Sequence, residues 1–264
     1  MNTCLKALIC SRKSFGLILR TFFTVLTAGF LTAGCASVNP FVRDFNIVPI
    51  PQEQELGTKM QAQIAQQMKL VQGTSMNKRV DGIGGALVSQ LPQKFFAYQF
   101  HVVEDKSLNA FAIPGGDIYV HSGLISAASD AELAGVIAHE IGHVYERHPA
   151  KAMSRAYGLQ YLAGMVAPQN AGKVQQLALQ FAAGGILNKY GRDDETEADE
   201  VAYYLMKKTS YPPSALITFF QKLQGASGGA GVPAFLSSHP PTPQRIQHLK
   251  DLIAQDTGQK RYGL

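Results

Sequence analysis

The chain has 264 residues and a formal net charge of +5, from 24 Lys and Arg residues against 19 Asp and Glu residues. Residues 1–34 hold four of the basic residues and none of the acidic ones, so the rest of the chain carries a net charge of only +1. This distribution argues against a nucleic-acid-binding protein, which carries a basic face on its folded part. With 46% hydrophobic and 16% charged residues, the chain is neither disordered nor fibrous.

The first 35 residues have the order of an export signal. A basic segment at 1–20 precedes an uncharged, largely apolar segment at 21–34, which is too short for the roughly 20 residues of a membrane-spanning helix. The alternative is an uncleaved signal anchor. The ending Thr-Ala-Gly-Cys resembles a bacterial lipobox and predicts that Cys35 is the lipidated first residue of the mature protein. The Ala36 that follows implies sorting to the outer membrane, facing the periplasm.

Cysteine usage limits the chemistry of the remaining chain. All three cysteines, Cys4, Cys10 and Cys35, lie in this leader. The body can therefore form neither an internal disulfide nor a Cys-ligated metal site. Any metal must be held by His and carboxylate side chains.

The body of the chain predicts one α+β domain, mainly helical, at 53–264, after a lipidated tether at 35–52. Strands are expected where apolar and β-branched residues cluster between turn residues, and helices where apolar residues recur at helical spacing. A capping box, Ser129 with Glu132, predicts the start of one helix, and Thr242 before Pro243 the start of the last. The predicted helices lie at 53–70, 77–91, 130–148, 151–166, 171–189, 192–208, 214–224 and 243–255, and the strands, forming a small and mainly antiparallel sheet, at 98–103, 109–113 and 117–120.

Two further segments have unusual composition. Residues 225–231 contain four glycines, and we expect them to be mobile. Residues 151–190 are apolar with few charges, which favours core packing; the alternatives are a lid over a cleft or a surface for a membrane or partner.

The most informative motif is His139-Glu140-Ile141-Gly142-His143, within the helix expected at 130–148. An α-helix advances about 100° per residue, so His139 and His143 lie only about 40° apart, and both imidazoles can reach one cation. Glu140 lies beside them, where it can take a proton from water. Zn²⁺ is the natural occupant of such a site. The alternative is two surface histidines on an amphipathic helix.

A catalytic zinc of this type needs a third protein ligand. The metzincin arrangement would place Gly at position 146 and His at position 149, where this chain has Glu146 and Pro149. His148 would lie about 140° round the helix from His143, so we expect a surface or helix-end histidine there.

Acidic residues at 192–200 supply the remaining candidates. Glu195 and Asp199 are four residues apart and share a helix face, so Glu195 can bind the metal while Asp199 accepts the N–H of a ligand histidine. The alternative is a solvated acidic helix start, favoured by the helix dipole.

These motifs resemble the gluzincin pattern, and the wider sequence resembles the M48 metallopeptidases. With the lipobox, the chain is most similar to the small periplasmic M48 lipoproteins, and the resemblance implies a single-domain gluzincin fold. Gly191 is a departure, since the family often has Ser there, but it lies at a helix start rather than at a ligand. The resemblance covers about 53–253 and is carried by residues 109–116, 132–143, 192–199, 238–242, 245 and 246.

The resemblance also implies residue roles at the metal. His139, His143 and Glu195 would bind one zinc ion per chain. Glu140 would be the general base and then the proton donor to the leaving amine.

Other residues would support the site. His239 would stabilise the oxyanion or cap the open zinc position at rest, and Arg245 would pair with an acidic ligand or with substrate; the alternatives are a loop histidine and a surface arginine. His101, His121 and His248 belong to no motif and are expected to be structural or solvent-facing. An edge strand would bind substrate as an added strand, the alternative being an ordinary core strand; its residues are Asn109, Ala110, Phe111 and Ala112.

The function expected from these features is a zinc-dependent endopeptidase that hydrolyses misfolded or stalled periplasmic and outer-membrane proteins. One alternative is a chaperone or assembly factor for outer-membrane proteins, with secondary protease activity. Another is a structural protein whose His pair binds no metal. The expected partners are unfolded or misassembled proteins, the membrane through the lipid anchor and the outer-membrane assembly machinery.

Overall fold

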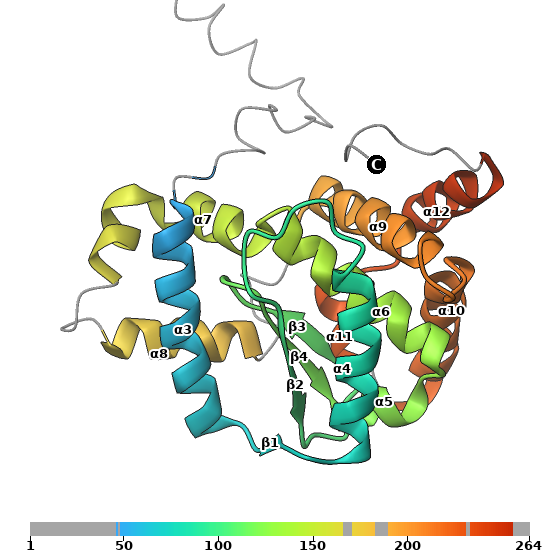
Figure 1. Cartoon of the computed structure of the whole chain (residues 1–264), viewed down its shortest axis with the longest axis horizontal. Coiled ribbons are helices and arrows are strands. Elements are labelled where there is room, and N and C mark those ends of the chain that lie inside the picture. The colour runs from blue at the N-terminus through green and yellow to red at the C-terminus, as the bar shows by residue number, and fades with distance from the viewer. Residues whose placement is uncertain (1–45, 47, 166–170, 183–189, 231–232, 256–264) are drawn as a thin grey trace, which may run out of the picture. The chain divides into compact units, whose positions relative to one another are not determined.

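The computed structural model describes residues 46, 48–165, 171–182, 190–230 and 233–255, in which helices surround one four-stranded sheet (Figure 1). The predicted class, α+β and mainly helical, is confirmed. The leader, Cys35 and most of the predicted tether lie outside these residues. The elements are α3 (Ile50–Gln67), β1 (Leu70–Val71), α4 (Ser75–Val88), β2 (Gln99–Val103), β3 (Ala110–Ala112), β4 (Asp117–His121), α5 (Ser122–Ala127), α6 (Asp130–Tyr145), α7 (His148–Met165), α8 (Ala171–Ala182), α9 (Arg192–Lys207), α10 (Ser214–Ala230), α11 (Ala234–Ser238) and α12 (Pro243–Gln255).

The sheet has the order β1-β2-β4-β3, which leaves β3 at an edge. The β1–β2 and β3–β4 pairs are antiparallel and the β2–β4 pair is parallel, so the sheet is mainly antiparallel. The turn between β3 and β4 contains Gly115 and Gly116 with φ of 89° and 110°. Only glycine adopts such angles readily, so these two residues allow β3 to turn back along β4.

The predicted helix starts are confirmed where caps mark them. Ser129 Oγ accepts a hydrogen bond from the Glu132 backbone N–H, and the Glu132 carboxylate accepts one from the Ser129 N–H, which closes the capping box of α6. Thr242 Oγ1 accepts from the Arg245 N–H, and Pro243 is the first residue of α12.

Several predicted boundaries, including the following three, differ from the observed ones by a few residues. The helix expected to reach residue 148 ends at Tyr145, because Arg147 adopts a φ of 58° that no α-helix accommodates. The last residues assigned to the tether are already helical, since α3 begins at Ile50. The helix expected to end at residue 224 continues through Ala230, despite a propensity cost of about 1 kcal/mol per glycine.

Helix α6 forms the centre of the fold, in contact with α4, α9, α10 and β3. Its apolar residues Leu133, Val136, Ile137 and Ile141 are fully buried. At Gly142, a Cβ atom would lie 2.7 Å from the carbonyl oxygen of Ala198 and 2.9 Å from its Cα. Helices α6 and α9 therefore approach closely enough that their backbones touch.

Replacing Gly142 by Ala is expected to destabilise the fold by about 1–3 kcal/mol, because the atoms in the way are backbone and cannot rotate aside. Urea unfolding measures the effect. Gly82→Ala is the matched control, since a methyl group on this helical glycine of α4 would meet no atom within 4 Å. Equal stability of the two variants would contradict the close approach of α6 and α9.

Helix α3 is attached to the segment after α6 by a hydrogen-bonded pair of side chains, the buried Glu53 and the partly buried Arg147. Glu53 is 1% exposed, and its Oε2 accepts a hydrogen bond of 2.7 Å from Arg147 Nε. Arg147 Nη2 also donates to the carbonyl oxygen of Val48. Burial raises the pKa of Glu53 from 4.5 to about 7, although the charge and hydrogen bond of Arg147 act in the opposite direction.

This raised pKa predicts how stability depends on pH. Between 4.5 and about 7, the folded protein holds a proton on Glu53 that the unfolded chain has released. The stabilisation is therefore fully present below 4.5 and is lost as the pH rises through 7, a change of about 3 kcal/mol. Glu53→Gln cannot titrate, so its free energy of unfolding should fall less across this range. If urea unfolding gives wild type and Glu53→Gln the same dependence of the free energy of unfolding on pH, the raised pKa of Glu53 is refuted.

The apolar segment at 151–190 contributes to the core where its side chains are described. Val174 and Leu177 of α8 are buried in one cluster with Met60 and Ile64 of α3 and with Phe111 of β3. Core packing, the favoured interpretation, is therefore confirmed for these residues. None of the helices in the described ranges is long and apolar enough to cross a bilayer.

Candidate metal and catalytic site

Helix α6 positions the two histidines of the sequence motif so that their Nε2 atoms face each other. His139 and His143 are both fully buried, and their Nε2 atoms lie 3.1 Å apart. The four-residue spacing places both rings on the same side of the helix. Their facing nitrogens can therefore share one ligand.

Helix α9 brings Glu195 to the same point in its first turn. Glu195 Oε2 lies 3.4 Å from His139 Nε2, and Oε1 lies 3.5 Å from His143 Nε2. The close contact of Gly142 with Ala198 allows this approach, since it lets the two helix backbones meet. Glu195 is 2% exposed, unlike the solvated acidic residue of the alternative interpretation.

His239, which follows α11, completes a cluster of four side chains. Its Nδ1 lies 3.0 Å from Glu195 Oε1, and its Nε2 lies 3.5 Å from Glu140 Oε1. One nitrogen or oxygen from each of His139, His143, Glu195 and His239 lies within 4.8 Å of the others. The structure thus places His239 inside the cluster, 1% exposed, rather than in a solvent-exposed loop.

Asp199 of α9 and Arg245 of α12 contact the cluster from one side. Asp199 Oδ1 lies 3.0 Å from His139 Nδ1. Arg245 donates hydrogen bonds of 2.7 and 2.8 Å to the two oxygens of Asp199, and its Nη1 lies 2.5 Å from Glu195 Oε2. Although burial alone would raise them, the Arg245 charge lowers the pKa values of Glu195 and Asp199, so both carboxylates are ionised. Arg245 is 3% exposed and is not a surface arginine.

Glu140 lies beside the two histidines with an incomplete hydrogen-bond shell. It is 1% exposed, and neither carboxylate oxygen has a hydrogen-bond partner among the described residues. Burial raises the pKa of Glu140, against the lowering effect of the neighbouring His239 and His139. A buried carboxyl group with a raised pKa and free oxygens is suited to accept and return a proton.

A metal ion fits this arrangement by donor type and by charge. The donors are imidazole nitrogens and a carboxylate, which suit zinc and similar divalent ions. Burial alone would lower the pKa of His139, but the Asp199 and Glu195 carboxylates raise it to about 9. The surroundings therefore favour positive charge at the centre of the cluster, which a divalent cation supplies.

Comparison with known proteins supports the assignment of this cluster as a metal and catalytic site. The sequence profile of Peptidase family M48 matches residues 75–253, which include all of the cluster. This chain belongs to peptidase family M48. It is 33% identical to metalloprotease YcaL of Escherichia coli (strain K12) over 67% of this chain and 70% of that protein, and 33% identical to metalloprotease LoiP of the same strain over 68% and 71%. It is 28% identical to the beta-barrel assembly-enhancing protease of that strain, over 78% of this chain but only 45% of the relative.

Membership of the family defines the general activity of the chain. M48 peptidases use a metal, and YcaL and LoiP are both named metalloproteases. The chain is thus a metalloendopeptidase with a His and Glu cluster that can hold a metal ion.

The edge strand of this M48 peptidase lies next to Glu140. His121 N donates to Asn109 O and Ile113 N donates to Asp117 O, so the residues that flank β3 on either side direct their backbone groups at the β4 side. In an antiparallel ladder every second residue turns its backbone groups to the other side. The N–H of Ala112 is accordingly directed at Glu140 and lowers the pKa of that carboxyl group. Strand β3 is at most 2% exposed, so the structure is closed to a substrate.

His148 lies at a helix end, as expected, because it is the first residue of α7, but the expected surface position was wrong. His148 is fully buried, and its Nδ1 lies 2.9 Å from His143 Nδ1. The expected angle of about 140° assumed one continuous helix, whereas the positive φ of Arg147 turns the chain so that α7 starts with its first side chain against α6. The sequence predicts a break between helices at 148–151, but no spacing rule indicates that it falls before His148.

Tyr190 was not identified from the sequence. Its ring stacks on His143, with centroids 4.0 Å apart and planes at 23°. Burial and the charges of Glu140 and Glu195 raise the pKa of Tyr190, so its hydroxyl keeps its proton beside the site. A lone tyrosine before a glycine carries no sequence signal for this position.

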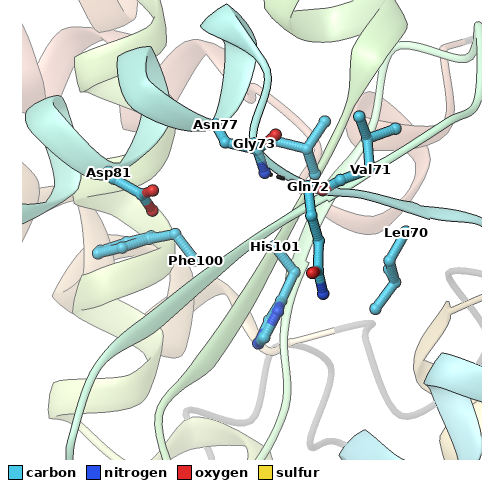
Figure 2. Close-up of a pocket in the computed structure, with 9 residues that line it drawn as sticks. Leu70, Val71, Gln72, Gly73, Asn77, Asp81, Phe100 and His101 are labelled. Carbon is cyan, nitrogen blue, oxygen red and sulfur yellow. Dashed lines mark hydrogen bonds between the residues drawn. The ribbon is translucent and has the colours of Figure 1, made fainter.

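A separate pocket of about 260 Å³ lies between β1, β2 and the start of α4 (Figure 2). Its lining includes Asn77, Asp81, Phe100 and His101, with none of the cluster residues. His101 Nε2 lies 2.6 Å from Asp117 Oδ1, in agreement with the structural role expected of it. The pocket therefore takes no part in the catalytic arrangement.

Proposed function

We propose that this M48 peptidase is a zinc-dependent endopeptidase that cleaves misfolded or stalled proteins of the periplasm and outer membrane. The convergence of His139, His143 and Glu195, with Glu140 unbonded beside them, carries the proposal. Donor type favours zinc, since two imidazoles and one carboxylate are a common catalytic zinc set.

Two of the three ligands are proposed to be held in position by a second residue. His139, His143 and Glu195 would hold the ion, and Asp199 and Arg245 would fix His139 and Glu195 in position. When bound, zinc would act as a Lewis acid that polarises the scissile carbonyl and lowers the pKa of water.

The proton transfers are proposed to belong to Glu140. Its raised pKa allows it to accept a proton from the attacking water and to give that proton to the leaving amine. His239 lies 3.5 Å from Glu140 and 3.0 Å from Glu195, so it would either donate to the oxyanion or occupy the open ligand position at rest.

The substrate is proposed to be an extended, unfolded segment. The outward backbone groups of Ala110 and Ala112 on edge strand β3 would pair with it, together with neighbouring Asn109 and Phe111. Backbone pairing makes little demand on side chains, so specificity would be loose. Since β3 and the cluster are buried, the segments that cover them must move before substrate binds.

The proposed location rests on the sequence of the leader. Cleavage before Cys35 and lipidation of that residue would anchor the enzyme to the outer membrane, facing the periplasm. Unfolded or misassembled envelope proteins would then be its substrates. Several relatives are named beta-barrel assembly-enhancing proteases, which supports contact with outer-membrane assembly machinery.

Those relatives also favour a second candidate, a chaperone or assembly factor with secondary proteolysis. Profiling new N-termini of exported proteins distinguishes the two in cells that carry wild type or Glu140→Gln. We expect cleavage products that occur only with wild type, and accumulation of misassembled proteins with the variant. If the variant performs the cellular role in full, proteolysis is not the function.

A further inference from the structure

His148 links the ligand cluster to a second acidic residue of α9. Its Nδ1 faces His143 Nδ1 at 2.9 Å, and its Nε2 faces Glu197 Oε2 at 3.1 Å. All three side chains are buried, with His148 and His143 fully so and Glu197 3% exposed. The result is a continuous row from Glu197 through His148 to His143.

The hydrogen-bond acceptor at one end of this row, Glu197, determines which ring nitrogens of His148 and His143 carry protons. An ionised carboxylate only accepts hydrogen bonds, so Glu197 requires a proton on His148 Nε2. With its proton on Nε2, the His148 ring presents the lone pair of Nδ1 to His143, where it can accept the proton of His143 Nδ1 at 2.9 Å. The lone pair of His143 is therefore on Nε2, the atom that faces His139 and Glu195.

His139 is oriented by a different partner. Its Nδ1 faces Asp199, which Arg245 holds by two hydrogen bonds. Each histidine of the cluster's α6 pair thus has its own carboxylate on α9 behind it, one directly and one through His148. A fixed tautomer and ring direction raise the metal affinity of an imidazole.

A competing interpretation is a second cation site. His148, Asp194 and Glu197 offer three donor atoms within 4.8 Å, and Asp194 Oδ1 has no hydrogen-bond partner among the described residues. Two cations already face these carboxylates, however: Arg155 lies 2.8 Å from Asp194, and Lys151 lies 3.9 Å from Glu197. Little negative charge is left for a divalent ion.

The proton arrangement gives a second argument against that site. A metal on His148 Nε2 would move the proton of His148 to Nδ1, which would then donate to His143 Nδ1. The proton of His143 would be forced onto Nε2, the nitrogen that must stay free for the metal of the cluster. His148 therefore cannot both bind a cation through Nε2 and accept the proton of His143 through Nδ1.

We propose that the Glu197–His148 pair is a positioning device that holds His143 with its proton on Nδ1 and its Nε2 free to bind the metal. The inference rests on the proposed function, because it assumes that His143 is a ligand. It assigns His148 and Glu197 no contact with substrate.

Zinc affinity, measured by competition with a chromophoric chelator, tests the proposal. We expect His148→Leu to bind zinc about 10–100-fold more weakly than wild type. His148→Gln, whose amide can accept from His143 and donate to Glu197, should recover most of the affinity. The matched control is His248→Leu, since His248 also pairs with a glutamate of α9, Glu200 at 3.1 Å, but is 34% exposed and outside the cluster. Its affinity should equal that of wild type.

A spectroscopic measurement on the unaltered protein covers the case in which His148→Leu does not fold. Nitrogen-15 NMR of the zinc-free wild type should show the ring proton of His143 on Nδ1. A proton on Nε2 would overturn the proposal.

Three further results of the zinc-binding measurement would show whether the positioning role, the proposed function or both are wrong. If wild type binds one zinc and His148→Leu binds it equally well, the positioning role is wrong while the proposed function stands. If wild type binds a second zinc that His148→Leu loses, the cation interpretation replaces it. If wild type binds no zinc, both proposals fail.

Discussion

Glu140→Gln is expected to reduce peptide hydrolysis by about 10²–10⁴-fold while leaving bound metal at the wild-type level. Glutamine has nearly the shape of glutamate but cannot take a proton from water. Stability should not decrease, because the glutamine Oε1 can still face the Ala112 N–H and a buried carboxyl group is removed. Cleavage of an unfolded model protein and metal analysis of the same sample measure both properties.

Asp130→Asn is the control for this variant, since Asp130 lies on the same helix and is exposed, where it pairs with Arg79 near the surface. It should retain wild-type activity. If Glu140→Gln cleaves as fast as wild type, another group is the base and the assignment is wrong.

Glu195→Gln is expected to remove both metal and activity. The substitution takes one negative charge from the cluster and leaves Arg245, whose Nη1 lies 2.5 Å from Glu195 Oε2, to rely on Asp199 as its ionised partner. Removing one member of a buried ion pair costs about 3–5 kcal/mol, and the shared Asp199 places this case at the lower end. Zinc content after dialysis and urea unfolding of the metal-free proteins measure the two effects.

Asp193→Asn serves as the control for Glu195→Gln. Asp193 is in the same first turn of α9 but is exposed, so its loss should change zinc content little. Stoichiometric zinc in Glu195→Gln, held as tightly as in wild type, would remove Glu195 from the ligand set.

The parts of the site that follow local rules could be predicted from the sequence. Helical spacing placed His139 and His143 on one face, and the same spacing paired Glu195 with Asp199. The capping box of Ser129 fixed the start of the helix that carries the histidines. Each of these inferences uses residues within one or two helical turns.

The parts that depend on chain reversal or on distant packing could not be predicted. His148 returns to the cluster because Arg147 adopts a positive φ, and no neighbouring residue signals that angle. Tyr190 reaches His143 from the segment before α9. The contact of Gly142 with Ala198 requires knowing that α6 and α9 are neighbours, which periodicity does not reveal.

Anomalous diffraction at the zinc edge, from crystals of Glu140→Gln grown with one equivalent of zinc, measures the ligand set most directly. We expect a single peak within bonding distance of His139, His143 and Glu195. The absence of any peak there, or a peak only between His148 and Glu197, would contradict the convergence of these three side chains on one metal ion.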